Sequence, residues 1–258
     1  MATAVSPSRP CPGSTTTTTI PVGPVRIQDV QDGTVATGQS VTLSDVFVTG
    51  LTVAGNGSRT FFLQEPDGVT TAGHVYPEYA GVRAFATSAT ASALPDLGSL
   101  MVGDCVTLSA DVTEFQGATV LSEITAFDVA DGPSSCGGSF PTPFVISDSG
   151  TSLFDIASDT DVATAGDQPG PKAEIFEGVL VQIAQVEVTS VEPSGDFRVA
   201  RIVDPTATLL VTRLLFAFPP PVLEQTYSII TGLLTQGQVS PGVNNYRLAP
   251  RDGSDIVP

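Results

Sequence analysis

The sequence contains few charged residues and very few basic ones. Charged residues make up 14% of its 258 residues, and 10 Lys and Arg residues stand against 27 Asp and Glu residues, for a net charge of −17 at pH 7. The excess of acid holds along the whole chain, so a nucleic-acid backbone would meet repulsion almost everywhere. The composition therefore disfavours nucleic-acid binding and is typical of a protein kept soluble outside a cell.

Long hydrophobic runs and catalytic motifs are also missing. No stretch of about 18 apolar residues occurs, so we expect no transmembrane segment. The N-terminus lacks the basic and apolar regions of an intact signal peptide. A nucleophile elbow, a phosphate-binding glycine loop and a zinc helix motif are absent. The single histidine, His74 in TAGHVYPEY, is the one candidate general base, and a loop histidine is more often solvated or packed. We therefore expect no enzyme.

Three cysteines are too few for a disulfide scaffold and lack metal-site spacing. Cys105 opens a predicted strand, and Cys136 follows the strand expected to pair with it. In an extracellular setting, which the acidity and low lysine content favour, these two would form a disulfide with Cα atoms within about 7 Å. The alternative is two unpaired thiols. Cys11 is then left over as a free thiol, an intermolecular partner or the remnant of a lipid anchor, the one route to membrane attachment.

Carboxylates are crowded in the region 140–173. Calcium is bound by several carboxylate and carbonyl oxygens, but the spacing does not match an EF-hand loop, and a solvated acidic linker is the simpler interpretation. We therefore expect no cofactor, with calcium as the one candidate. The carboxylates concerned are Asp148, Asp155, Asp159, Asp161 and Asp167.

The strongest positive signal is an internal repeat. The apolar positions of 39–51 (QSVTLSDVFVTGL) recur in 178–191 (GVLVQIAQVEVTSV) at an offset of 140. Both copies alternate with period 2, which marks a half-buried strand. In both, two residues replace one between apolar neighbours, at Ser44-Asp45 and at Ala184-Gln185. Because such a slip reverses the buried face, each strand must bulge or bend at this point.

The rest of the chain repeats one plan of five strands around each bent strand. This is the strand count of a partly open Greek-key barrel, and repetition of the plan predicts two copies of one fold. The predicted fold class is therefore all-β, with two tandem five-stranded barrels. Four segments are predicted: an extended Thr/Pro-rich arm (1–24), barrel 1 (25–139), an Asp/Gly/Pro-rich linker (140–173) and barrel 2 (174–258). Barrel 1 is expected to open with a short edge segment at 25–35. The apolar island of the linker, at 153–156, is expected to pack on barrel 2.

The strand and turn signatures resemble a kind of bacterial domain. The stretches RIQDVQDGTVATGQSVTLSDVFVTG, FFLQEPDG and MVGDCVTLSADVTEFQG in the first half, and LLFAFPPP, ITGLL and NNYRLAPRDGSDI in the second, are similar to the tandem OB-fold-like domains of secreted or surface proteins of Gram-negative bacteria, including some of myxobacterial type. Related domains accompany secreted nucleases. The resemblance covers about residues 25–258 and implies OB-like barrels at an extracellular or outer-surface location. No active-site residue carries over with it.

Two groups of residues are candidates for binding. A nucleic-acid ligand would use the face of the second and third strands of a barrel, and Phe216 and Phe218 in LLFAFPPP either cap barrel 2 or form a contact patch. The candidate ligand face of barrel 2 consists of Arg198, Arg201, Arg213 and Arg247, with Phe197 and Tyr246, and that of barrel 1 consists of Phe61, Phe62, Arg83 and Phe85.

The N-terminal arm is a candidate donor strand for an unpaired barrel edge. Its β-prone residues are Thr15, Thr17, Thr19, Ile20 and Val22, and they would pair with their own domain or with a neighbouring subunit, which would build a head-to-tail filament. A tail without a partner is the alternative. We therefore expect a non-enzymatic extracellular or cell-surface binding and assembly protein that binds proteins or itself. The alternative is an accessory nucleic-acid-binding module of a secreted nuclease system.

Overall fold

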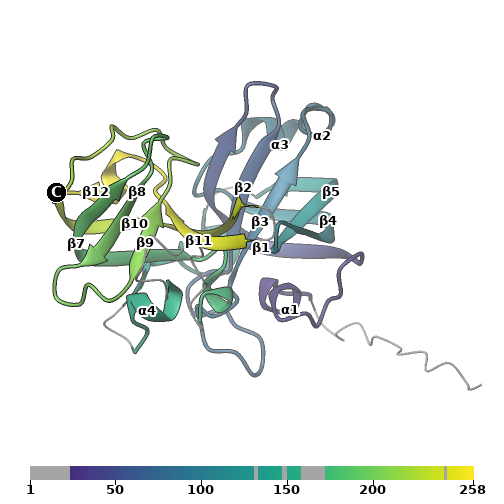
Figure 1. The fold of residues 1–258 in the computed structure, drawn as a ribbon. Helices are drawn as coiled ribbons and strands as arrows, with labels where there is room; N and C mark the ends of the chain where they lie inside the picture. Colours follow the sequence, from purple (N-terminus) through teal and green to yellow (C-terminus); the bar gives the residue numbers. More distant parts are fainter. Residues whose placement is uncertain (1–23, 131–132, 147–149, 158–171, 241–242) are drawn as a thin grey trace, which may run out of the picture.

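The computed structural model describes residues 24–130, 133–146, 150–157, 172–240 and 243–258, which form two closed five-stranded barrels side by side (Figure 1). Barrel 1 has the strand order β1-β2-β3-β5-β4, closed by pairing of β4 with β1. Barrel 2 has the order β7-β8-β9-β11-β10, closed by pairing of β10 with β7. The third and fifth strands of each barrel are parallel. This shared order is consistent with a tandem OB-like fold.

The strands match the alternation of the sequence, with apolar residues facing each barrel's interior. In β4, for example, Val106, Leu108, Ala110 and Val112 are all buried. The strands of barrel 1 are β1 (Ser40–Val53), β2 (Arg59–Gln64), β3 (Gly81–Ala86), β4 (Cys105–Phe115) and β5 (Ala118–Val129). Those of barrel 2 are β7 (Leu180–Val191), β8 (Phe197–Arg201), β9 (Thr208–Val211), β10 (Thr226–Ser240) and β11 (Val243–Ala249), with β6 (Phe144–Val145) added beside β7 and β12 (Ile256–Val257) beside β10.

The predicted parity breaks are present in both long first strands. In β1 the pairing with β4 shifts register between Leu43 and Val46, and Asp45 has φ of 60°. Its counterpart at the offset of 140, Gln185, has φ of 53°, although the pairing of β7 with β10 continues in register there. The left-handed residue lets the core side chains on both sides of each break stay buried.

The connection between third and fourth strands differs between the barrels. In barrel 1 it contains α2 (Ser88–Ala93) and α3 (Pro95–Ser99), which place Ala91, Leu97 and Leu100 in the core. The Thr87 hydroxyl caps α2 by accepting from the N–H of Thr90. In barrel 2 the connection contains three consecutive prolines and no helix. Its Phe218 enters the core of barrel 2, as the side chains from α2 and α3 enter the core of barrel 1.

Two features of the N-terminal region correct the sequence-based expectations. The predicted edge segment at 25–35 is wrong: it holds the helix α1 (Ile27–Gln31), which buries Ile27 and Val30 three residues apart on one face. Barrel 1 is closed, so the partly open barrel and its unpaired acceptor edge are also wrong. Val25 forms a single parallel bridge with Leu43 of β1. The candidate donor residues Thr15, Thr17, Thr19, Ile20 and Val22, and Cys11, lie outside the described residues.

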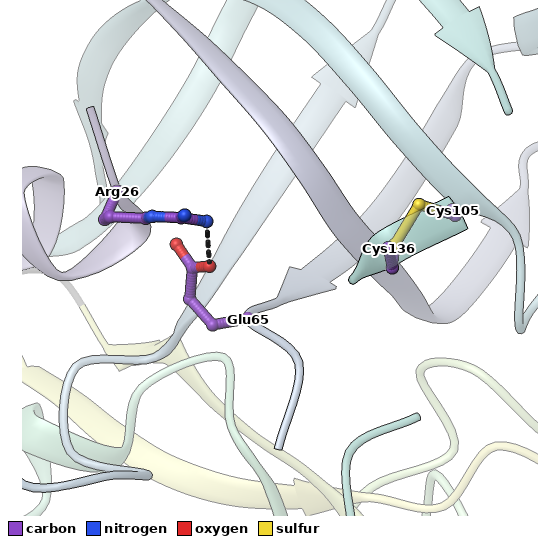
Figure 2. Close-up of a disulfide and its surroundings, with 4 residues drawn as sticks. All are labelled: Arg26, Glu65, Cys105 and Cys136. Atoms are coloured by element: carbon purple, nitrogen blue, oxygen red, sulfur yellow. Dashed lines mark hydrogen bonds and ion pairs between the residues drawn. A yellow bond between two sulfur atoms is a disulfide. The ribbon is translucent and has the colours of Figure 1, made fainter. Parts of the chain in front are cut away.

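A disulfide and a buried ion pair stabilise barrel 1 at separate places (Figure 2). Cys105, at the start of β4, and Cys136, at the end of the 3-10 helix η1 (Pro133–Cys136), form a disulfide with Cα atoms 5.5 Å apart, within the limit set by the sequence-based prediction. The buried Glu65 carboxylate pairs with Arg26 at 3.2 Å and accepts from the N–H of Ile27 at 2.8 Å. Burial raises the pKa of Glu65, and these contacts oppose that effect.

The described part of the linker contacts both barrels. Phe140 packs edge-on against Phe47 of barrel 1, with ring centroids 5.4 Å apart, whereas residues 153–156 lie on barrel 2. The apolar island forms the short helix α4 (Leu153–Ile156), whose Leu153 and Ile156 join the core of barrel 2. The Ser152 N–H and hydroxyl both donate to Asp155, which closes a capping box. The remaining short elements are the 3-10 helices η3 (Glu174–Phe176) and η4 (Gly253–Asp255).

The two barrels pack through a tight seam. Gly81, at the start of β3, and Gly178, just before β7, approach so closely that a Cβ on Gly81 would lie 2.2 Å from the carbonyl carbon of Gly178. The Gln64 side chain accepts from the N–H of Leu180 at 2.8 Å, in a buried hydrogen bond between barrels. An apolar cluster of Phe62, Leu180 and Leu233 lies beside it. Barrel 2 therefore covers part of the outer surface of β2, which is half of the usual OB ligand face.

Candidate binding surfaces

The outer faces of the barrels can be compared residue by residue, because their strand registers match. In barrel 1 one row of cross-strand neighbours is Phe62, Arg83, Val120 and Thr113. The equivalent row in barrel 2 is Arg198, Leu210, Arg247 and Thr235. Two chemically different faces have thus been built on one framework.

The barrel 1 face is hollowed where barrel 2 does not cover it. We call this depression the Arg83 hollow; it has a volume of about 310 Å³. Two phenylalanine rings flank it, Phe85 with 37% and Phe115 with 53% of its surface exposed. The lining residues are Arg83, Phe85, Thr113, Glu114, Phe115, Val120 and Ser122.

Arg83 lines the hollow and packs against an aromatic ring. Its guanidinium carbon lies 5.8 Å from the ring centroid of Phe115, in cation–π range. Its buried Nε has no hydrogen-bond partner in the described part of the chain. Burial lowers the pKa of Arg83, and the nearby Glu177 opposes this shift. Packing against Phe115 and the charge of Glu177 therefore position the arginine, whose Nε stays unpaired among the described residues.

A group of carboxylates surrounds the inner side of the hollow, at the seam. Glu177 is almost completely buried, and its Oε2 has no partner among the described residues. Burial and the neighbouring Glu174 and Glu114 raise its pKa well above the usual value, against the opposing effect of Arg83. The Tyr246 hydroxyl donates to Glu174, and burial and these carboxylates raise the pKa of Tyr246. This side of the hollow is unfavourable for an anion.

The structure divides the candidate arginine face of barrel 2 between two sides of the sheet. Arg198 and Arg247 both flank Leu210 on the outer face. Arg201, the last residue of β8, has the opposite strand parity to Arg198. Arg213 lies beyond the end of β9, where it donates to the Ser194 carbonyl at 3.0 Å and lies over Phe218 at 5.9 Å. Arg198 is only 8% exposed, next to Glu192. These four arginines do not form one continuous basic track.

The two phenylalanines of the LLFAFPPP stretch differ in burial. Phe218 is buried and packs edge-on against Phe197, with ring centroids 5.3 Å apart, so it caps the barrel 2 core. Phe216 is half-buried and lines a depression of about 350 Å³. The prolines that follow also line it, together with Tyr227, Ile256 and Pro258.

A second depression continues the first one. It has a volume of about 480 Å³ and shares Tyr227 and Pro258 with it. Ile202 and Val203 line it and are 53% and 68% exposed. We call the two depressions together the proline groove. The lining residues of the proline groove are Gln185, Ile202, Val203, Phe216, Phe218, Pro219, Pro220, Pro221, Gln225, Thr226, Tyr227, Ser228, Gly253, Ile256 and Pro258.

The remaining candidates have local roles where they are described. His74 Nε2 lies 2.9 Å from an Asp32 carboxylate oxygen, and its ring packs edge-on against Tyr79, which ties its loop to the end of α1. Asp155 caps α4, and hydrogen bonds from Ser152 lower its pKa. The described ranges contain no group of three His, Cys, Asp or Glu side chains that could hold a metal ion. The other four candidate calcium ligands, Asp148, Asp159, Asp161 and Asp167, lie outside them.

Sequence reasoning identified Arg83 and Phe85 but missed Phe115 and Glu114. The sequence did contain a signal for Phe115. It stands two residues after Thr113 in β4, so both side chains point to the outer face, next to the turn at Gln116-Gly117. Of the other two candidates in barrel 1, Phe61 lies in the core and Phe62 lies under barrel 2.

No protein-family model matches this chain, and no curated protein is significantly similar to it in sequence. None of the helices in the described ranges is long and apolar enough to cross a membrane.

Proposed function

We propose that the chain is a non-enzymatic binding and assembly protein of the extracellular space or the outer cell surface, like the Gram-negative, myxobacterial-type surface proteins that it resembles. The observation that carries this proposal is the proline groove. Its two depressions share Tyr227 and Pro258 in their linings, and exposed apolar side chains such as Ile202 and Val203 contribute to them. A surface of this kind supports protein binding better than catalysis.

The groove has the chemistry to receive an extended, proline-containing segment. Grooves lined with aromatic residues bind such segments, because the polyproline II conformation is already ordered before binding. The arm at 1–24 contains Pro7, Pro10, Pro12, Pro21 and Pro24. Its attachment point next to α1 and the groove next to β12 lie at opposite ends of the molecule (Figure 1). Docking of one copy's arm into the groove of the next copy would therefore build a head-to-tail assembly.

Sedimentation velocity of the full chain over a wide concentration range tests this proposal. Val203→Asp places a charge in the groove and should shift the assembly to monomer. Val75→Asp is the matched control, since Val75 and Val203 are both 68% exposed and Val75 is outside the groove. Deletion of residues 1–23 should have the same effect as Val203→Asp. A chain that stays monomeric at every concentration, or assembles equally well in all three variants, would rule out assembly through the arm.

Single-stranded nucleic-acid binding is the second candidate, favoured by one observation. Arg198 and Arg247 flank Leu210 on the outer face of barrel 2. If they contact phosphates, binding of a fluorescent oligothymidine should weaken steeply as salt rises from about 50 to 200 mM. Loss of this binding in Arg247→Gln, with retention in Arg251→Gln, would establish the second candidate. Absence of binding at low salt eliminates it.

A further inference from the structure

We propose that the Arg83 hollow on barrel 1 binds a neutral sugar ring of an oligosaccharide. The hollow lies on the outer face of β3, β5 and β4, whereas the part of the usual ligand face on β2 is covered by barrel 2 through Phe62 and Gln64. Its volume of about 310 Å³ is at the small end of the range of ligand pockets. It therefore fits a short sugar unit better than a folded partner.

The polar groups of the hollow require a ligand that both donates and accepts hydrogen bonds. Arg83 contributes its guanidinium group to the lining of the hollow, and its buried Nε has no hydrogen-bond partner in the described part of the chain. Glu114 offers carboxylate acceptors, of which Oε1 accepts from the Thr119 hydroxyl at 2.9 Å. A hydroxyl group accepts from arginine and donates to a carboxylate. Adjacent ring hydroxyls satisfy both partners together.

The charges exclude the ionic alternatives. An anionic ligand would meet Glu114 in the hollow, with Glu174 and Glu177 close behind it. A cationic ligand would meet Arg83, which already occupies the cation–π position over Phe115. A neutral ligand avoids both repulsions, and the net charge of −17 opposes polyanions in general.

The aromatic walls match the apolar face of a sugar ring. The two exposed rings, Phe85 and Phe115, lie on β3 and β4 at the sides of the hollow. Neither ring carries a polar group, so they provide flat apolar contact area. Thr113 and Ser122, whose hydroxyls lie 3.1 Å apart, provide further hydrogen-bonding groups within the hollow.

Barrel 2 is the internal comparison for this site, since different described residues occupy the equivalent positions there. Leu210 stands at the position of Arg83, and Gly237 stands at the position of Phe115. The Arg247 guanidinium fills the space above Gly237, 2.5 Å from where a Cβ would lie. Barrel 1 thus has an open depression beside Phe115, whereas the Arg247 side chain fills the equivalent space beside Gly237 in barrel 2.

Calorimetric titration of the full chain with four tetrasaccharides tests the proposal. The probes are cellotetraose and N-acetylchitotetraose, which are neutral, tetragalacturonate, which is anionic, and the glucosamine tetramer, which is cationic. We expect binding of a neutral probe and none of the charged ones. Phe115→Ala should weaken this binding about tenfold or more, and Phe115→Tyr, which keeps the ring, should retain it.

Two further variants make the outcome specific to the hollow. Glu114→Gln removes the negative charge and should admit tetragalacturonate. Val203→Asp in the proline groove should leave neutral-sugar binding unchanged, so failure of the proposed assembly function and failure of this site are separable. Absence of binding for all four probes, preference of the unmodified chain for a charged probe, or unchanged binding in Phe115→Ala would overturn the proposal.

Discussion

The two barrels close their ends in different ways although they share one strand order. Barrel 1 places α2 and α3 between its third and fourth strands, and three side chains, Ala91, Leu97 and Leu100, enter the core from this connection. Barrel 2 has consecutive prolines there, which cannot continue a helix, and Phe218 enters its core from this connection. The helical connection covers its own apolar surface. The proline connection instead leaves exposed apolar residues and forms one wall of the proline groove.

The outer faces differ in a related way. Arg83 of barrel 1 lies beside an open hollow, while the equivalent Leu210 of barrel 2 is buried between two arginines. The depressions described above lie at different places on the two barrels: a polar and aromatic hollow on barrel 1 and a largely apolar groove on barrel 2. Duplication of a fold allows such divergence, because strand order depends on inward residues and binding depends on outward ones.

Removal of the barrel 2 cap is expected to have the largest effect. Phe218→Ala should cost about 3–5 kcal/mol of unfolding free energy, because it removes a large buried side chain from the barrel 2 core. Chemical denaturation measures the loss, and hydrogen exchange should place it in β8, β9 and β10. Leu97→Ala in barrel 1 should cost less, since Ala91 and Leu100 share its role.

The control for this prediction is Phe216→Ala. Phe216 is half-buried on the groove side of Phe218, so its removal should cost clearly less. Equal losses of unfolding free energy for the two variants would mean that both phenylalanines of the connection, and not Phe218 alone, close the end of barrel 2.

The disulfide is expected to have the next largest effect and should act on barrel 1. It joins residues separated by 31 positions, and its loss in Cys105→Ala/Cys136→Ala should cost about 3–4 kcal/mol. Hydrogen exchange should show faster exchange in β1, β4 and β5, with the strands of barrel 2 little changed. Equal loss of protection in barrel 2 would instead show that the two barrels unfold as one unit through the seam.

Much of the fold could be predicted from the sequence because inward residues obey local rules. The offset of 140 and the two-residue breaks locate the bends at Asp45 and Gln185, since a half-buried strand must keep its apolar parity. The helix α1 was missed because it is only one turn long, and its buried partner Glu65 is distant in sequence. Closure of the barrels was missed because it depends on the short parallel pairing of β3 with β5, which leaves no pattern in the sequence.

The binding surfaces could be predicted only in part. Arg83 and Phe85 were identified by their strand, but the hollow also needs Phe115 and Glu114 from another strand pair. Strand position alone could not separate Arg198 and Arg247 from Arg201 and Arg213. The seam was not predicted, because residues such as Gly81, Gly178 and Gln64 are ordinary in sequence and become special only when two barrels meet.

The seam carboxylate should give the smallest effect of the three, and a distinctive pH dependence. Burial raises the pKa of Glu177 in the folded state, with further contributions from Glu174 and Glu114, while Arg83 and the Thr119 N–H oppose the shift. A raised folded pKa means that the stability contribution of Glu177 is fully present below its unfolded pKa and is lost as pH rises through the folded pKa. The unmodified chain should therefore lose stability at this site as pH rises from about 4.5.

Glu177→Gln tests this, because glutamine is neutral at every pH and does not require proton uptake on folding. The variant should melt close to the unmodified chain near pH 4 and above it at pH 7, by about 2–4 °C if the gain is about 1 kcal/mol. The buried Glu65, whose pKa is also raised by burial, contributes a slope of the same sign in both proteins and cancels from the difference. The exposed Glu123→Gln is the matched control and should show no pH-dependent difference. A difference that is constant with pH would mean that Glu177 contributes packing at the seam and not the cost of a buried charge.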